Sequence, residues 1–400
     1  MIKEMTEKEE KIEEVLTRGV DKIYPSRKAF KELLLSGKKI RVYQGFDPSS
    51  SSLHLGNLVG VLKLKQFQEL GHEVIFLMGD FTGMIGDPTD KSAARQKLSR
   101  EKVLENCKAW REQIARFLAL TGKNPAKIMF NGEWLDKISF KDLIEIASNF
   151  TVGQMIQRDF FQKRIKEEKP IYLHEFLYPL AQALDSVNLN VDVEIGGSDQ
   201  TFNMLCGRDL VKILKNKEKF VLTTKLLIDK EGKKVGKTTG NAVFLDIAAS
   251  DMFGKIMAFP DEVIFPAFEL LTPLPLKEVE SLKKEKVNPL ILKKKLALEI
   301  VKINYGEKEA KGAQEEFDRV FKKKELPEEI SQIKIKEKYL PLLELLVKTK
   351  LASSKSEAKR LILEGGVKIN KEKQQNWQVK IEIKKGMIIQ VGKRKFVKLA

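Results

Sequence analysis

Short apolar segments alternate with amphipathic segments between residues 39 and 245, and this alternation limits the chain to few folds. The segment Lys39–Phe46 predicts a buried strand, Gly56–Leu70 predicts a helix that ends at Gly71, and Glu73–Met78 predicts the next strand. Such a succession favours a parallel α/β sheet. Because open sheets of this type bind ligands beyond the carboxyl ends of their strands, the loops there are expected to carry the site.

The first of these loops carries a histidine at the start of a predicted helix. The strand breaks at Asp47-Pro48, and His54-Leu55-Gly56-Asn57 opens the helix that follows. Free N–H groups and the helix dipole favour phosphate at such a position. A lone histidine is more often an ordinary surface or core residue, but the strand-to-helix turn beside Gly56 favours a functional His54, with Asn57 next to it.

A second loop, between Asp229 and Asn241, contains three glycines and four lysines, among them Lys233, Lys234 and Lys237. Its tail Gly236-Lys237-Thr238 has the form of a phosphate loop, but that motif needs a glycine five residues earlier, where this chain has Glu231. The two loops together therefore predict an ATP site that lacks the usual phosphate loop.

A polar stripe marks the apolar segment from His174 to Asp185. Tyr178, Gln182 and Asp185 lie at positions i, i+4 and i+7, so they share one face of a helix. Polar groups on a buried helix are costly unless they are exposed or line a pocket. The surrounding leucine, alanine and phenylalanine residues leave little room for an exposed face, so the stripe predicts a pocket.

The two loops resemble the signature pair of class I aminoacyl-tRNA synthetases, usually written HIGH and KMSKS. Four further segments narrow the resemblance to bacterial-type tyrosyl-tRNA synthetases, and they are Tyr43–Pro48, Thr82–Pro88, Tyr178–Asp185 and Gly196–Gln200. The resemblance runs essentially end to end. It implies an α/β catalytic domain with a Rossmann-like parallel sheet, an all-α domain, and a small α+β S4 RNA-binding domain.

The resemblance also assigns roles to individual residues. Those expected to bind tyrosine are Tyr43, Thr82, Asp87, Tyr178, Gln182, Asp185 and Gln200. Those expected to contact ATP or the adenylate are Gly45, Asp47, Gly56, Gly197 and Asp199. Those expected to act in catalysis are His54, Asn57, Lys91, Arg95, Lys234, Lys237 and Thr238. Two positions depart from the family pattern, because Asn57 replaces the more frequent second histidine and Gln44 stands where relatives often carry cysteine.

The implied reaction joins L-tyrosine to ATP and then to tRNA(Tyr). Tyrosine's carboxylate attacks the α-phosphorus of ATP, and positioned cations stabilise the charge that develops on the phosphate oxygens. ATP is a substrate accompanied by Mg²⁺, and neither an organic cofactor nor a dedicated metal site in the protein is expected. The terminal ribose hydroxyl of the tRNA then attacks the adenylate.

Positive charge is concentrated at the end of the chain. The formal net charge is +17, and the segment Leu340–Ala400 contributes +10 of it, with fifteen Lys or Arg against five Asp or Glu. A Lys-rich surface would explain part of this excess, but its concentration favours polyanion binding. A helix from Ser354 to Gly365 followed by alternating strands resembles the S4 fold. The RNA face would contain Lys355, Lys359, Arg360 and the segment Lys393–Lys395.

These patterns predict three domains. They are a catalytic domain over residues 1–247 with a helical insertion at about 100–170, a helical domain over 248–335 that meets the anticodon arm, and an S4 domain over 340–400. In the family, the insertion carries the interface of a homodimer. Residues 1–14 are charged and no apolar run approaches a membrane span of ~20 residues, so we expect a cytoplasmic protein without membrane association.

Three other functions compete with tyrosine–tRNA ligation. Tryptophan specificity would require different residues at positions 43 and 185. A catalytically retired RNA-binding or splicing protein on the same scaffold would lack the lysine loop or the pair Lys91 and Arg95, and both are present. A nucleotidyltransferase without a tRNA partner would not need the basic segment at the end of the chain.

Overall fold

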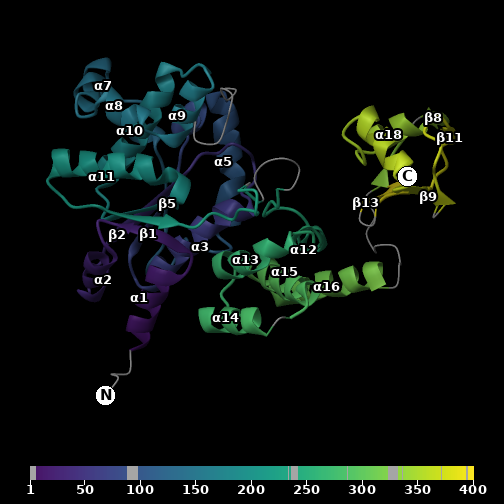
Figure 1. The fold of residues 1–400 in the computed structure, drawn as a ribbon, viewed down its shortest axis with the longest axis horizontal. Coiled ribbons are helices and arrows are strands. Elements are labelled where there is room, and N and C mark those ends of the chain that lie inside the picture. Colours follow the sequence, from purple (N-terminus) through teal and green to yellow (C-terminus); the bar gives the residue numbers. More distant parts are fainter. Residues whose placement is uncertain are drawn as a thin grey trace. The chain divides into compact units, whose positions relative to one another are not determined.

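The structure is a computed structural model of the whole chain, and it divides into two compact units, residues 1–310 and 311–400 (Figure 1). It describes residues 6–87, 98–232, 234–235, 242–285, 287–322, 332–335, 337–370, 372–392 and 395–400. The first unit takes in the expected catalytic domain and most of the expected helical domain. The boundary at residue 247 therefore stays a prediction.

A six-stranded sheet forms the centre of the first unit, in the order β1-β6-β5-β2-β3-β4. The strands are β1 (Val20–Tyr24), β2 (Arg41–Phe46), β3 (Glu73–Met78), β4 (Lys127–Phe130), β5 (Val193–Gly197) and β6 (Phe220–Thr224). All neighbouring pairs are parallel except β1 with β6, which is antiparallel. The parallel α/β sheet and the strands expected near residues 39–46 and 73–78 are confirmed.

The segment expected to be a helical insertion contains a strand as well. Between residues 100 and 170 the structure has the helices α5 (Arg100–Ile114), α6 (Gly132–Leu135), α7 (Phe140–Ala147), α8 (Val152–Ile156) and α9 (Asp159–Lys166), and also β4. Strand β4 pairs with β3 and closes one edge of the sheet. The sequence did not indicate this strand, because four residues, Lys-Ile-Met-Phe, are too few to show a strand period.

Helices cover both faces of the sheet and bury its apolar side chains (Figure 1). They include α1 (Glu7–Thr17), α2 (Arg27–Leu35), α3 (Leu55–Glu69), α10 (Leu173–Leu189) and α11 (Thr201–Lys215). Helix α3 contacts β2, β3 and β5, while α10 packs along α11. The helix expected over residues 56–70 is confirmed, and Gly71 ends it with a left-handed φ of 86°.

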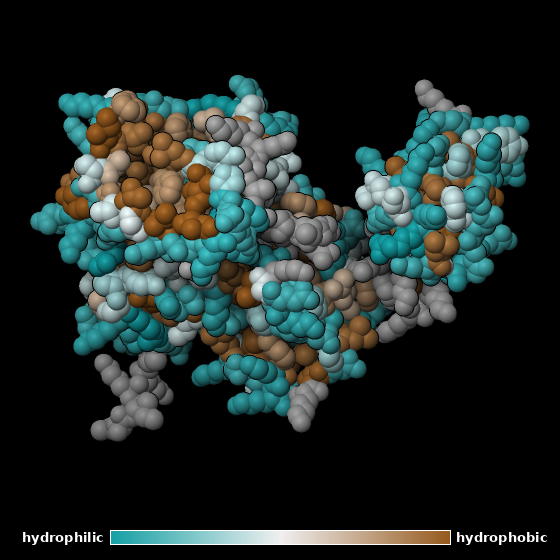
Figure 2. Space-filling model, turned by 45° about the horizontal axis from the view of Figure 1, so that its top comes forward, coloured by the Kyte–Doolittle hydropathy of each residue, from teal (hydrophilic) through white to brown (hydrophobic). Residues whose placement is uncertain are grey.

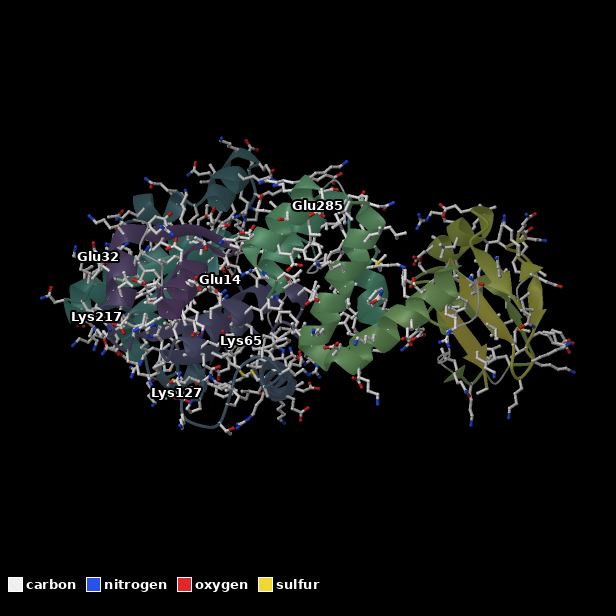
Figure 3. The ribbon with its side chains drawn as sticks, turned by 90° about the horizontal axis from the view of Figure 1, so that it is seen from below. Glu14, Glu32, Lys65, Lys127, Lys217 and Glu285 are labelled. Carbon is white, nitrogen blue, oxygen red and sulfur yellow. The ribbon has the colours of Figure 1, made fainter. Side chains whose placement is uncertain are left out.

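Two lysines on α3 differ in burial, because one lies on the core side of the helix and the other on the solvent side. Lys65 projects from the surface in Figure 3 and lies near Glu69, at 3.9 Å. Lys63 is buried, and its Nζ donates to the carbonyls of Val15 (3.0 Å) and Arg18 (2.7 Å) at the end of α1. Burial lowers the pKa of Lys63 to about 7. The α1 carbonyls satisfy this buried donor and fasten the first helix to the sheet layer.

Beyond the sheet the first unit is helical, as expected, over the described residues from 248 to 310. The helices are α12 (Ala249–Ile256), η3 (Asp261–Val263), α13 (Ile264–Leu271), α14 (Leu276–Lys284) and α15 (Pro289–Tyr305), and α16 (Glu307–Lys322) continues into the second unit. Arg18 joins this region to α1, because its guanidinium donates to the carbonyls of Glu269 and Thr272, both at 3.1 Å. In the described part of the chain, no helix has the length and apolar character needed to cross a membrane.

An exposed apolar surface lies on α7, α8 and the start of α10. Phe140, Ile144, Val152 and Leu173 are 79%, 55%, 75% and 78% exposed, and we call these four residues the apolar face. Figure 2 shows hydrophobic residues gathered on the part of the first unit where Figure 1 places these helices. Large exposed apolar patches typically mark surfaces that bind another protein.

The second unit is a small α+β domain with its own core. It contains α17 (Leu342–Lys348) and α18 (Lys355–Leu363), with the strands β7 (Gln332–Ile333), β8 (Tyr339–Pro341), β9 (Val367–Ile369), β10 (Glu372–Lys373), β11 (Lys380–Glu382), β12 (Ile388–Val391) and β13 (Lys395–Leu399). Ser354 caps α18, and its Oγ accepts the Glu357 N–H at 3.2 Å. The expected helix and following strands are confirmed, whereas α17 and β13 were not anticipated.

Candidate active site

A cavity of about 420 Å³ opens at the carboxyl ends of the central strands. Its lining includes every predicted tyrosine, ATP and catalytic residue that the structure describes. These are Tyr43, Gly45, Asp47, His54, Gly56, Asn57, Thr82, Asp87, Tyr178, Gln182, Asp185, Gly197, Asp199, Gln200 and Lys234. The polar stripe on α10 thus faces a pocket. Lys91, Arg95, Lys237 and Thr238 lie outside the described residues.

His54 caps helix α3 in a reciprocal arrangement with Asn57. Nδ1 of His54 accepts the N–H of Asn57 (3.3 Å), and Oδ1 of Asn57 accepts the N–H of His54 (3.1 Å). Because Nδ1 is an acceptor, the neutral imidazole carries its proton on Nε2, where it can donate to a ligand oxygen. The Asn57 amide likewise keeps Nδ2 as its donor. Both side chains can therefore offer N–H groups to phosphate at a helix N-terminus.

The backbone at the start of α3 is hydrogen-bonded to the segment that follows the lysine loop. His54 and Phe244 form an antiparallel bridge, and the N–H of Leu55 donates to the carbonyl of Val243 at 3.0 Å. In the first half of the lysine loop, Lys234 Nζ lies 2.7 Å from Asp199 Oδ2. Lys234, His54 and Asn57 line the same cavity, as a site for the phosphates of ATP requires.

Asp47 is the centre of a hydrogen-bond network in the middle of the cavity. Its Oδ1 accepts the hydroxyl of Thr82 (2.7 Å), and its Oδ2 accepts the hydroxyl of Tyr178 (2.8 Å). A Cβ added at Gly79 would lie 2.3 Å from Asp47 Oδ1, so only glycine leaves room for this carboxylate. Burial, together with the Asp47 charge, raises the pKa of Tyr178 well above its ordinary value, so the phenol keeps its proton.

Asp185 lies at the buried end of the cavity and is 3% exposed. Its Oδ1 accepts the Trp134 Nε1–H (2.9 Å), and its Oδ2 accepts the Asn131 Nδ2–H (3.3 Å). The Asn131 amide is oriented by the N–H of Phe81, which donates to its Oδ1 at 3.0 Å. Burial raises the pKa of the Asp185 carboxyl well above its usual range, while the two donors oppose that rise.

Tyr43 on β2 lies beside this carboxyl group and is fully buried. Its hydroxyl is 2.9 Å from Ser186 Oγ. Ser186 in turn contacts the buried ion pair of Glu194 and Lys219. Gln182, one turn before Ser186 on α10, donates its Nε2–H to Glu194 at 2.9 Å.

A third group of polar residues surrounds Asp87 and Gln200, which both line the cavity. Gln200 Nε2 donates to Asp87 Oδ2, and Arg158 lies 3.5 Å from Asp87 Oδ1. Asn203 Nδ2 donates to Gln200 Oε1 at 2.9 Å, which orients the Gln200 amide. The described residues contain no group of three or more His, Cys, Asp or Glu side chains that could hold a metal ion.

Sequence reasoning missed the residues that orient this site. Asn131 and Trp134 follow β4, in a segment interpreted as a helical insertion. Glu194 lies inside an apolar strand, and Lys219 directly precedes another. Two opposite charges in strands that are neighbours in a parallel sheet are a recognisable signal, but only once the strand order is known.

Three of the predicted RNA-binding residues, Lys355, Lys359 and Arg360, lie exposed on α18 in the second unit. Lys355 pairs with Glu344 (2.6 Å), Arg360 lies 3.7 Å from Glu364, and Lys359 Nζ lies 4.2 Å from the centre of the Trp377 ring. Lys393 and Arg394 are outside the described residues, as is the side chain of Lys395.

Comparisons with known proteins agree with this geometry. The family model described as tRNA synthetases class I (W and Y) matches residues 35–322, and the tyrosine–tRNA ligase SYY-like C-terminal domain matches residues 322–399. Tyrosine–tRNA ligases of Aquifex aeolicus and Haemophilus influenzae are 42% and 44% identical, and each alignment covers 96% of this chain, with 97% and 95% of the relative.

Solved structures show the same fold at lower sequence identity. A C-terminally truncated mitochondrial tyrosyl-tRNA synthetase of Aspergillus nidulans aligns with a TM-score of 0.66 and 22% identity, over 78% of this chain and 94% of that one. The tyrosyl-tRNA synthetase of Archaeoglobus fulgidus, solved with L-tyrosine, aligns with a TM-score of 0.58 and 21% identity, over 76% and 99%. The chain belongs to the class I tRNA synthetases of the tryptophan and tyrosine group and, within it, to the tyrosine–tRNA ligases.

Proposed function

We propose that the protein activates L-tyrosine with ATP and transfers it to tRNA(Tyr). The observation that carries this proposal is the buried end of the cavity, where the polar groups of Tyr43 and Asp185 lie together. A phenol hydroxyl would pair with these groups, whereas a phenylalanine ring would leave them buried and unpaired. The cavity volume of about 420 Å³ suits an amino acid joined to a nucleotide.

The middle of the cavity would hold the backbone of tyrosine. Asp87, Tyr178 and Gln182 would surround its ammonium group, while Gln200 would lie beside its carboxylate. Tyr178 and Gln182 lie one turn apart on α10, and the Gln200 amide donates to Asp87. Holding the carboxylate in line with the α-phosphorus turns adenylate formation into a reaction between fixed groups.

The outer end of the cavity would hold ATP. Asp47 and Asp199 would accept from ribose hydroxyls, and Gly45, Gly56 and Gly197 would let the backbone approach the nucleotide closely. His54, Asn57 and Lys234 would donate to the phosphates as pyrophosphate leaves. Lys91, Arg95, Lys237 and Thr238 would add to this charge stabilisation.

Mg²⁺ would arrive with ATP as part of the substrate. Magnesium binds substrate phosphates readily and keeps several waters, so it does not need a complete protein cage. The N–H groups at the α3 N-terminus would donate to phosphate oxygens beside the ion.

The second unit would bind tRNA, and the apolar face would join two subunits. Lys355, Lys359 and Arg360 lie exposed on one short helix, α18, where they can reach phosphates. The apolar face exposes large hydrophobic side chains that a second copy would bury. Sedimentation should show a dimer that Phe140→Asp converts to a monomer, and a stable, active wild-type monomer would disprove the dimer. We place the protein in the cytoplasm, with its tRNA.

ATP–pyrophosphate exchange with each of the twenty amino acids, without tRNA, tests the proposed function. Exchange confined to tyrosine is the expected result. Exchange with tryptophan would show that Tyr43 and Asp185 do not select the substrate. No exchange at all would favour an RNA-binding protein on a retired catalytic scaffold.

A further inference from the structure

A second stripe of buried polar groups lies on helix α5. Asn106, Trp110 and Gln113 are at positions i, i+4 and i+7, so they share one face of the helix, and they are 2%, 2% and 3% exposed. Polar groups at this depth are costly unless they are paired. Their partners are backbone groups in the loop of residues 47–53, which leads from β2 to His54.

This loop depends on side chains for its hydrogen bonds, because residues 47–53 form neither helix nor strand. Asn106 Nδ2 donates to the carbonyl of Pro48 at 2.8 Å. One turn later, Trp110 Nε1 donates to the carbonyl of Ser50 at 3.1 Å. The stripe therefore follows the loop step by step toward the start of α3.

Gln113 completes the stripe and uses both ends of its amide. Its Nε2 donates to the carbonyl of Ser51 (3.3 Å), and its Oε1 accepts the N–H of Leu53 (2.8 Å). The hydroxyl of Ser52 donates to the same oxygen at 3.3 Å. Because Leu53 directly precedes His54, the Gln113 amide fixes the backbone at the point where α3 begins.

Arg116, in the turn that follows α5, holds a second segment. Its Nη1 donates to the carbonyl of Leu245 (2.8 Å) and to Asn304 Oδ1 (3.2 Å). The same carbonyl accepts Asn304 Nδ2 at 3.0 Å and the Tyr305 hydroxyl at 2.9 Å. Three donors on one carbonyl fix the segment that follows the lysine loop.

The two anchors meet on either side of His54. The N–H of Leu245 donates to the carbonyl of Leu53 (2.8 Å), and the N–H of Leu55 donates to the carbonyl of Val243 (3.0 Å). Both backbone groups of Leu53 are thus bonded, its N–H to Gln113 and its carbonyl to the segment that Arg116 holds. His54 lies between two residues whose backbones are fixed in this way.

We propose that Gln113 and Arg116 are positioning residues that hold His54 in place for adenylate formation. Neither of them lines the cavity, so they act through the backbone beside His54. A donor stabilises the charge of the transition state only if it is already in place, and a displacement of about 1 Å can cost about 10²-fold in rate. This inference rests on the proposed function and adds residues that do not touch the substrate.

Gln113→Leu tests the first anchor, because it removes both ends of the amide at similar volume. The rate of adenylate formation should fall about tenfold, the effect of one lost hydrogen bond. Tyrosine binding should not change, since the tyrosine end does not contact this loop through Gln113. Stopped-flow adenylate formation and equilibrium tyrosine binding supply the two values, and a wild-type rate would overturn the proposal.

The matched control is Gln68→Leu, at the opposite end of α3. Gln68 also uses both ends of its amide, since Nε2 donates to the carbonyls of Ala119 (2.7 Å) and Asn124 (3.0 Å) and Oε1 accepts the N–H of Ala119 (3.0 Å). It does not line the cavity. The control should keep the wild-type rate, and equal losses in the two variants would mean that Gln113 only stabilises the fold.

Combining each variant with His54→Ala distinguishes positioning from a structural role. A displaced imidazole contributes less, so His54→Ala should cost about tenfold less in rate in the Gln113→Leu background than in wild type. In the Gln68→Leu background it should have its full effect. Additive losses for Gln113→Leu with His54→Ala would show that the two residues act independently and would contradict the proposal.

The outcomes separate this inference from the proposed function. Wild-type protein without tyrosine-dependent exchange would contradict the function itself. Normal wild-type exchange with additive losses would contradict only the inference. If Gln113→Leu does not fold, Arg116→Met takes its place in the same cycle, because Asn304 and Tyr305 still pair the Leu245 carbonyl. Its effect should be smaller, about threefold, and additivity with His54→Ala would again overturn the proposal.

Discussion

The two ends of the cavity are built differently. At the tyrosine end, Tyr43, Tyr178 and Asp185 are 0%, 7% and 3% exposed, and their polar atoms bond to other protein groups. At the ATP end, Lys234 and Asp199 are 23% and 19% exposed, and the lysine lies in a loop. The tyrosine end, which selects the substrate, is thus buried and hydrogen-bonded in advance. The ATP end, which stabilises charge during the reaction, is more accessible to solvent.

The largest expected effect comes from the ATP end. Lys234→Ala should lower the rate of adenylate formation by roughly 10²- to 10³-fold, because its charge acts on phosphates in the transition state. Tyrosine binding should be unchanged, since Lys234 contacts Asp199 and not the buried end. Stopped-flow adenylate formation and equilibrium tyrosine binding measure the two quantities.

The matched control is Lys230→Ala, at an exposed position in the same loop. It should leave both quantities near the wild-type values. Equal losses in the two variants would mean that the loop contributes only general positive charge. A loss of tyrosine binding in Lys234→Ala would show that the two ends are not separate.

A substitution at the tyrosine end should change substrate selection rather than the stabilisation of charge on the phosphates. Asp185→Asn should lower kcat/KM for tyrosine by about 10- to 100-fold, because it replaces a carboxyl oxygen that accepts from the phenol hydroxyl in a buried site. The kcat/KM for phenylalanine should stay nearly constant, since that substrate has no hydroxyl to pair. Equal losses for both substrates in exchange assays would contradict a selective role for Asp185.

Sequence reasoning succeeded unevenly across these two ends. Residues that touch a ligand lie in local motifs at strand ends, so the pattern around His54 and the stripe on α10 could be recognised directly. Trp134 and Glu194 act through contacts with residues 51 and 12 positions away, respectively, which only the assembled sheet brings together. Strand β4 was not predicted for a related reason. Its four residues are too few to show an alternating pattern, and they form a strand because they pair with β3.

The buried carboxyl group should also leave a signature in stability. The pKa of Asp185 is raised in the folded protein, so the folded state binds more protons than the unfolded state above pH ~4. The free energy of unfolding should therefore fall with rising pH, by up to about 1.4 kcal/mol per pH unit, until the raised pKa is passed.

Asp185→Asn removes this contribution. Urea unfolding of wild type and variant between pH 4 and 8 should show a difference that moves steadily in favour of the variant as the pH rises. A difference independent of pH would mean that Asp185 titrates normally. Burial of the Asp185 carboxyl at the tyrosine end would then not reduce the stability of the folded protein.

The smallest expected effect separates structure from chemistry at the ATP end. His54 caps α3 through Nδ1, so His54→Ala should lower the free energy of unfolding by about 1 kcal/mol and also slow adenylate formation. His54→Asn should restore the stability, because asparagine is a favourable N-cap, but not the rate, because its short amide cannot place a donor where Nε2 lies. Recovery of the rate with the stability would mean that His54 serves only as a cap, and the ATP end would then be as preformed as the tyrosine end.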